Sequence, residues 1–192
     1  MAEVLQQVSW VASSIGILAT GCSAYLAYRS LNRQQKIVKA DHDRSKRAFA
    51  VKLLLKWNNN TLVHRRAIEK AFPGLLDHKH GDYTQLTKKH ATEIYNATNN
   101  ESELFELRFH IIELLNFFEA VAMAYENSVA DQEILETSFK GTLNNYYIAL
   151  HDFLAIVEDC RQYQPWKPYI TLVRRWNPNL PPLRPPPDDV CR

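Results

Sequence analysis

The chain opens on its longest uncharged stretch, Val4 to Tyr28, in which no side chain carries a charge. About 20 apolar residues in a helix span the hydrocarbon core of a bilayer, so this stretch is long enough to cross once. No other segment combines this length with a lack of charge. The pattern therefore predicts a single transmembrane helix over residues 1–28.

Small and polar residues follow a period of their own within this stretch. They recur at alternating steps of three and four residues, which places them along one stripe of a helix. This small-residue stripe consists of Gln6, Ser9, Ser13, Gly16, Thr20, Ser23 and Ala27. Small side chains let membrane helices approach closely and hydrogen-bond to one another, so we expect the stripe to face other copies of the chain. Two alternatives are hydroxyls that bond to carbonyls of their own helix, and a ring of helices whose hydroxyls line a pore.

The charges on either side of the stretch predict its orientation. Glu3 precedes it, and four basic residues follow it, namely Arg29, Arg33, Lys36 and Lys39. Basic residues are retained on the cytoplasmic side, so we expect the N-terminus outside a bacterial inner membrane and the rest in the cytoplasm. A cleaved signal peptide would carry its basic residues before the apolar run. Residues 29–47 are interpreted as a basic juxtamembrane helix near anionic lipid headgroups, with a solvated connecting helix as the alternative.

Helical periodicity continues along the rest of the chain, and alternation typical of strands is rare. The fold class predicted is therefore all-α, with a helical bundle over residues 48–176. The helices are expected at Arg29–Trp57, Thr61–Phe72, Thr84–Ala97, Glu101–Tyr125 and Asp131–Arg161, with a short one after Pro165. The apolar stripe of Glu101–Tyr125 is the widest, which predicts a central helix. Gly141 suggests a close helix crossing, and the proline-rich end, residues 177–192, is expected to be a disordered tail.

Composition and charge narrow the function classes. The 192 residues carry a net charge of +2, which does not give the strongly basic footprint of a nucleic-acid-binding protein. The three cysteines are odd in number and irregularly spaced, so we expect reduced thiols and no zinc framework. No cofactor and no metal site are predicted.

Candidate chemistry is sparse. His78, His80 and Asp82 lie close together in a segment that we interpret as a surface loop. Glu106, His110 and Glu113 fall on one helix face, which is half of a carboxylate-bridged bundle site. A complete site would need an equivalent Glu and His elsewhere, and His151 with its acidic neighbours does not have that spacing. We therefore interpret the histidine as a core residue whose hydrogen bonds are made within the fold.

A helical ribonuclease would need a cation and a general base on neighbouring helix turns. Nucleases of this type in bacterial defence place an arginine four to six residues before a histidine. No arginine here stands at that distance, and Arg108 comes only two residues before His110. We therefore predict no catalytic residue and favour a protein that is not an enzyme.

Several apolar and aromatic segments carry a resemblance to a known group of proteins. They are residues 53–58 (LLLKWN), residues 114–119 (LLNFFE), and the terminal pattern of Trp166, Tyr169, Leu172 and Trp176. With the N-terminal membrane helix, they resemble a bacterial family of uncharacterised single-pass membrane proteins with a helical cytoplasmic domain. The layout is also similar to the membrane accessory protein of type VI-B CRISPR systems, which implies a pore-like role in anti-phage defence.

These observations lead to one expected function and two alternatives. The expected function is that of a non-enzymatic inner-membrane protein, with the lipid bilayer, other copies of itself and a cytoplasmic protein as its partners. The first alternative is a membrane-tethered ribonuclease using Arg108 and His110. The second is a monomeric membrane adaptor.

Overall fold

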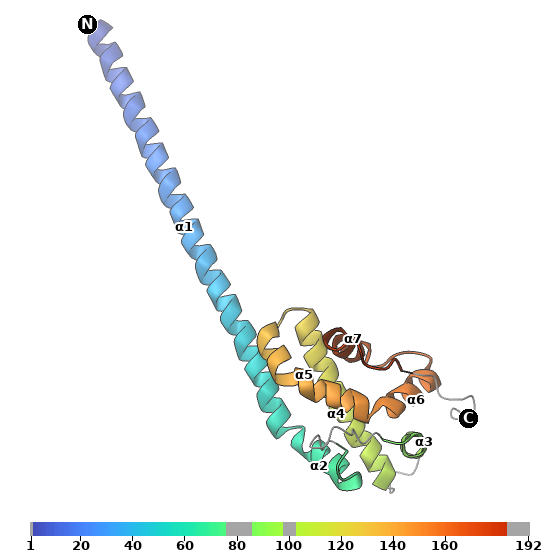
Figure 1. The fold of residues 1–192 in the computed structure, drawn as a ribbon. Helices are drawn as coiled ribbons and strands as arrows, with labels where there is room; N and C mark the ends of the chain where they lie inside the picture. Colours follow the sequence, from blue (N-terminus) through green and yellow to red (C-terminus); the bar gives the residue numbers. More distant parts are fainter. Residues whose placement is uncertain (1, 76–85, 98–102, 184–192) are drawn as a thin grey trace. The chain divides into compact units, whose positions relative to one another are not determined.

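The computed structural model describes residues 2–75, 86–97 and 103–183, and their side chains from Tyr25 onward. Within these ranges all regular structure is helical (Figure 1), which confirms the all-α prediction. The helices are α1 (Ala2–Asn59), α2 (Leu62–Ala71), α3 (Lys88–Asn96), α4 (Glu103–Glu126), α5 (Gln132–Ala149), α6 (His151–Arg161) and α7 (Lys167–Trp176). The chain divides into two compact units, Met1–Ser45 and Lys46–Arg192.

The first unit belongs to α1 alone. Its side chains between Tyr25 and Ser45 are exposed, apart from a half-buried Asn32. Large apolar side chains are among them, with Tyr28 64% exposed and Val38 68% exposed. Over the part of the chain that the structure describes, no helix has the length and apolar character needed to cross a membrane.

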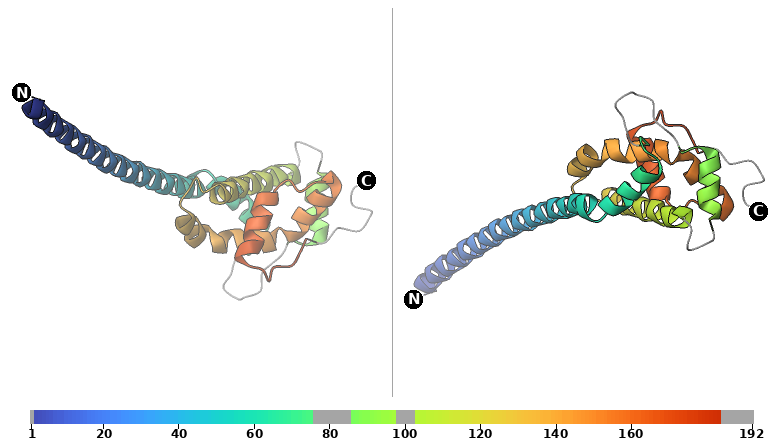
Figure 2. Two further views of the ribbon diagram at one scale, coloured as in Figure 1. Left: turned by 90° about the horizontal axis from the view of Figure 1, so that it is seen from above. Right: turned by 90° about the horizontal axis from the view of Figure 1, so that it is seen from below.

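The second unit is a bundle built around α4. This helix packs against α2 and α7, and α3 packs against α6 (Figures 1 and 2). The inward side chains of α4, including Ile111, Leu114 and Phe118, are completely buried. The central position predicted for this helix is therefore confirmed, because its wide apolar stripe is covered from several sides.

Aromatic side chains tie the end of α1 into this bundle. The Trp57 ring lies 5.8 Å from Phe117 and 5.7 Å from Phe118, measured between ring centroids. Phe118 in turn lies 5.3 Å from Tyr169 on α7. Offset and tilted aromatic pairs at such distances add about 0.5–1.5 kcal/mol beyond the area they bury.

The single helix predicted over Asp131–Arg161 is wrong, because the chain changes direction at Leu150. Leu150 has φ −102° and ψ 12°, and it separates α5 from α6. The Ala149 carbonyl accepts a hydrogen bond of 2.9 Å from the Leu86 N–H. In a continuous helix this carbonyl would bond four residues ahead. The break thus depends on a segment far away in the sequence.

Two further expectations are corrected. A Cβ atom built on Gly141 meets nothing within 4 Å, so this glycine does not mark a close helix crossing. Cys160 is disulfide-bonded, which contradicts the expectation of reduced thiols. Spacing along the sequence does not report which cysteines meet in the fold.

The packed domain also extends past Trp176 into the predicted tail. The Tyr147 hydroxyl donates to the Pro181 carbonyl at 2.7 Å, and His151 Nε2 lies 3.1 Å from the Pro182 carbonyl. Leu180 is buried. The bundle therefore continues to Leu183, where the described residues end.

Candidate functional site

The residues predicted to act at the membrane all lie on α1. Arg29, Arg33, Lys36 and Lys39 are exposed. In the small-residue stripe, Ala27 is exposed, and the side chains of Gln6, Ser9, Ser13, Gly16, Thr20 and Ser23 lie outside the described residues. The function of the stripe therefore stays a prediction.

A histidine pair joins α2 to α4. His64 Nδ1 lies 2.8 Å from His110 Nδ1, and the ring centroids are 5.1 Å apart. One nitrogen must donate and the other accept, so the two rings share one proton along this contact. The sequence pattern points to His110 but not to His64, because the two residues stand 46 positions apart and no spacing rule connects them.

The surroundings of the pair disfavour a proton on His64. Burial lowers the pKa of His64, the neighbouring His110 lowers it further, and Glu113 raises it. Two of the three residues predicted on one face of α4, His110 and Glu113, therefore act on the same partner from α2. Glu106 lines a neighbouring pocket of about 440 Å³ with His90 and His110.

Nothing in the described residues assembles a metal site. They contain no group of three or more His, Cys, Asp or Glu side chains able to hold a metal ion. His78, His80 and Asp82 lie outside the described residues. Two histidine nitrogens alone fall short of the four ligands of a structural zinc site.

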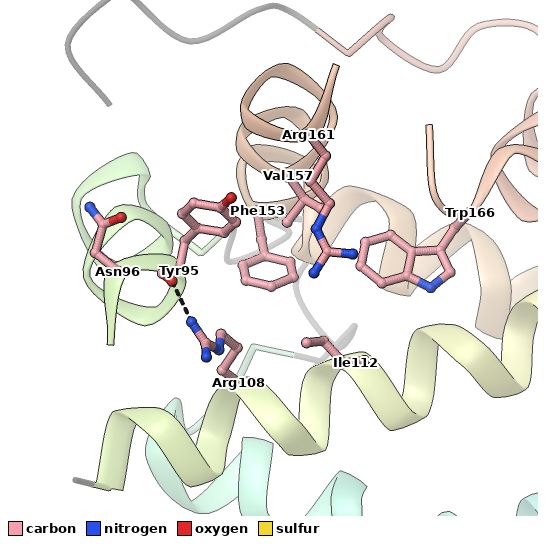
Figure 3. Close-up of a pocket in the computed structure, with 8 residues that line it drawn as sticks. All are labelled: Tyr95, Asn96, Arg108, Ile112, Phe153, Val157, Arg161 and Trp166. Atoms are coloured by element: carbon pink, nitrogen blue, oxygen red, sulfur yellow. Dashed lines mark hydrogen bonds between the residues drawn. The ribbon is translucent and has the colours of Figure 1, made fainter. Parts of the chain in front are cut away.

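A larger pocket of about 550 Å³ opens between α3, α4 and α6 (Figure 3). Arg108 and Arg161 point into it beside the rings of Phe153 and Trp166. Both arginines already have partners in the chain. Arg108 Nη1 donates to the Tyr95 carbonyl at 2.6 Å, and Arg161 Nη1 donates to the Tyr163 hydroxyl at 3.3 Å.

The structure does not bring Arg108 and His110 together. Residues two apart on a helix do not face each other. Accordingly, Arg108 lines the pocket beside α3 and α6. His110 contacts His64 on α2 and lines a different pocket. The cation and the base of the ribonuclease alternative therefore have no common substrate position in this arrangement.

Comparison with known proteins identifies the family. Residues 11–176 match a domain of unknown function, DUF4760. No curated protein and no solved structure matches the chain. The matched region includes most of α1 and every helix of the bundle. The chain belongs to the DUF4760 family.

Proposed function

We propose that this protein is a non-enzymatic, membrane-anchored helical protein that self-associates through α1 and binds a cytoplasmic protein through its bundle. The observation that carries the proposal is that the uncharged stretch from Val4 to Tyr28 lies inside an uninterrupted helix, α1, that runs from Ala2 to Asn59. A helix with about 25 uncharged residues is long enough to enter a bilayer.

Self-association is supported by the exposed part of α1. Helices in water obtain most of their stability from packing, and an unsupported helix is marginal. The first unit nevertheless leaves Tyr25, Leu31 and Ile37 about 60% exposed. Packing against further copies of α1 would bury these side chains, and the small-residue stripe supplies the close approach.

The proposed orientation places the bundle in the cytoplasm. Four exposed basic residues follow the anchor, and such residues are retained on that side. The disulfide at Cys160 stands against this placement, because disulfides are rare in the reducing cytosol.

The biological setting that we propose is anti-phage defence, with a pore-like accessory acting on the membrane. The support is the layout of one membrane helix followed by a helical domain, which is similar to the membrane accessory protein of type VI-B CRISPR systems. A shared arrangement of domains supports a shared function less strongly than a shared functional site does. Membrane depolarisation on expression would distinguish the pore from a monomeric adaptor.

The ribonuclease alternative is less well supported. Arg108 is held by the Tyr95 carbonyl, and His110 by His64. A general base has to lie within hydrogen-bond reach of the proton that it removes, near the group that stabilises the reacting charge. Cleavage of labelled RNA by the purified chain, lost on His110→Ala, would revive this alternative.

Sizing of the detergent-extracted full chain tests the proposed self-association. Replacing Ser13 and Gly16 with leucine should convert the oligomer into monomers, because bulky side chains prevent close approach of the helices. The matched control replaces Ser14 and Gly21, which have no stripe residue three or four positions away, with leucine and should leave the oligomer intact. A monomeric unchanged chain, or an oligomer that survives both stripe substitutions, would contradict the proposal.

A further inference from the structure

The pocket between α3, α4 and α6 is lined by two positive charges and by no acidic side chain. Of the eight residues that line it, Arg108 and Arg161 are basic and none is Asp or Glu. The pocket that contains His110 differs, because Glu103 and Glu106 belong to its lining. Among the described residues, neither Arg108 nor Arg161 forms an ion pair. A cavity lined by one sign of charge favours an occupant of the opposite sign.

Solvent reaches both arginine side chains. Arg108 is half-buried and Arg161 is exposed. Figure 3 shows the two side chains extending into the same pocket, Arg108 from α4 and Arg161 from α6. Each donates one hydrogen bond within the described residues, Arg108 to the Tyr95 carbonyl and Arg161 to the Tyr163 hydroxyl. A guanidinium has five N–H groups, so both arginines keep donors for a ligand.

Contacts within the bundle hold Arg108 at the pocket. Its Nη1 donates to the Tyr95 carbonyl in the last turn of α3 at 2.6 Å, and its guanidinium lies 5.0 Å from the centroid of the Phe105 ring. A hydrogen bond together with a cation–π contact limits rotation of the side chain. A donor that is already oriented loses less entropy when a ligand binds.

The ends of two helices offset only part of the positive charge. Asn96, the last residue of α3, and Arg161, the last residue of α6, both line the pocket. The C-terminus of a helix carries roughly half a negative charge, which attracts cations. Two such ends offset about one of the two guanidinium charges, so roughly one positive charge remains for an anion.

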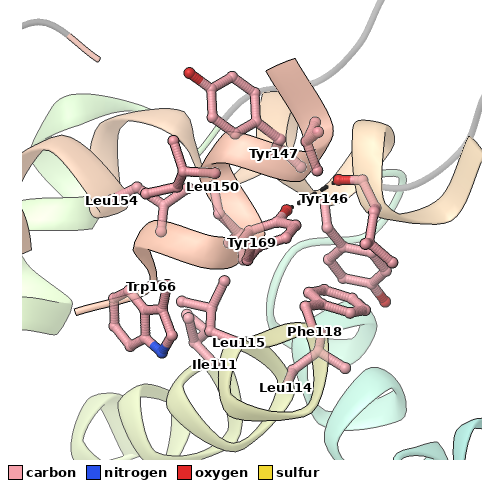
Figure 4. Packing of buried hydrophobic residues seen from close by; sticks show 14 of the residues in the cluster. Ile111, Leu114, Leu115, Phe118, Tyr146, Tyr147, Leu150, Leu154, Trp166 and Tyr169 are labelled. Carbon is pink, nitrogen blue, oxygen red and sulfur yellow. Dashed lines mark hydrogen bonds between the residues drawn. The ribbon is translucent and has the colours of Figure 1, made fainter. Parts of the chain in front are cut away.

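The size and the apolar lining favour an organic anion over a bare ion. The volume of about 550 Å³ is typical of small-molecule sites, which measure roughly 300–1,000 Å³. Tyr95 and Ile112 are half-buried, so they offer apolar surface to an organic group. Trp166, also in the lining, is 4% exposed and belongs to the hydrophobic cluster of the core (Figure 4). The pocket is therefore closed toward the core.

Two guanidinium groups on different helices select the kind of anion. A phosphate monoester presents three acceptor oxygens and close to two negative charges, and arginine binds such oxygens in pairs. A carboxylate has two oxygens in one plane, for which one guanidinium suffices. We infer that this pocket binds a small organic phosphate monoester, whose oxygens accept from Arg108 and Arg161 and whose organic part packs against Tyr95 and Ile112. The assignment does not depend on the membrane anchor.

Thermal unfolding of the full chain in a neutral detergent tests the site. The probe is phenyl phosphate, and benzoate and sodium chloride at matched ionic strength are the references. At about ten times Kd, a probe that binds only the folded chain should raise Tm by roughly 3–6 °C. We expect this shift with phenyl phosphate alone. No shift beyond that of sodium chloride, or an equal shift with benzoate, would overturn the inference.

Substitutions at Arg161 locate the binding. Arg161→Gln changes an exposed side chain, so the fold should survive, and Arg174→Gln, at an exposed arginine of α7 outside the lining, is its matched control. Arg161→Gln should need roughly a tenfold higher phenyl phosphate concentration for the same shift from its own baseline. Arg161→Lys, which keeps the charge without the paired donors, should lie between Arg161→Gln and the unchanged chain. Unchanged binding to Arg161→Gln, or an equal loss in Arg174→Gln, would contradict the assignment.

Discussion

At the scale of single residues, the His64–His110 contact is the feature of the bundle with the clearest dependence on pH. Two imidazole rings with nitrogens 2.8 Å apart tolerate one shared proton between them. If both rings became imidazolium, two positive charges would stand side by side in a half-buried setting, with two N–H groups facing each other. The pair therefore favours a neutral His64.

Protonation should destabilise the fold through His64. Its pKa in the folded chain is below the ordinary value, mainly because of burial. As pH falls below about 6.5, the unfolded chain takes up this proton before the folded chain does. Stability therefore decreases toward acid pH, and it is recovered as pH rises toward neutrality.

Urea unfolding of the full chain between pH 5 and 8 measures this effect. His64→Gln should reduce the loss of stability toward pH 5, because it removes the titrating group. Val63→Gln changes the exposed neighbouring position and serves as the control. An identical pH dependence for His64→Gln and the unchanged chain would refute the assignment.

At the scale of helices, hydrogen bonds to side chains of α4 hold the start of α7 in place. The Tyr169 N–H near the beginning of α7 donates to Glu119 Oε2 at 3.1 Å, and Trp166 Nε1 donates to Asn116 Oδ1 at 3.1 Å. The first N–H groups of a helix have no partner within it, and the Glu119 carboxylate of α4 satisfies one of them, the Tyr169 N–H. Burial raises the pKa of Glu119, and the Tyr169 N–H counteracts this rise.

Two substitutions at Glu119 separate its role as a hydrogen-bond acceptor from the pH dependence that its carboxyl adds to stability. Glu119→Ala should cost about 1–3 kcal/mol, because it leaves a buried N–H unpaired. Glu119→Gln keeps an acceptor and should cost less. A carboxyl with a raised folded pKa makes stability fall as pH rises through that pKa, and Glu119→Gln lacks this contribution.

Denaturant unfolding of both variants at pH 5 and pH 8 checks these expectations. The Gln variant should gain stability relative to the unchanged chain on going from pH 5 to pH 8. If alanine and glutamine cost the same at both pH values, the Glu119 contact does not support α7.

Helix positions could be predicted from the sequence where nearby residues determine where a helix begins or ends. They could not be predicted where contacts with distant segments determine it. The end of α1 at Asn59 and the start of α4 at Glu103 follow from asparagine runs and acidic first turns. The break at Leu150 depends on Leu86, which no periodicity reports. Likewise, the contact between His110 and His64 joins two helices, and no pattern along either helix reports it.

At the scale of the whole molecule, the chain combines a proposed anchor on α1 with a helical bundle. The bundle has a buried core and pockets of different chemistry, one lined by partnered arginines and one lined by His90 and His110. The DUF4760 match covers both the bundle and most of α1. Most of the helix that carries the proposed anchor therefore lies within the matched domain.

The side of the membrane on which the bundle lies is a prediction about the whole molecule. A green fluorescent reporter fused to the C-terminus should fluoresce, because the basic residues after the anchor keep the bundle in the cytoplasm. An exported-enzyme reporter at the same position, which is active only outside, should be inactive. The reverse pair of results would place the bundle and its Cys160 disulfide in an oxidising compartment.

Extraction of membranes at alkaline pH tests the central claim most directly. The full chain expressed in bacteria should sediment with the membranes and resist extraction. The variant with Ile15→Lys and Leu18→Lys should be released, because each charge near the middle of a membrane helix costs about 2.5–3.5 kcal/mol. Recovery of the unchanged chain in the soluble fraction, or continued membrane retention of the double-lysine variant, would contradict a membrane anchor at Val4 to Tyr28.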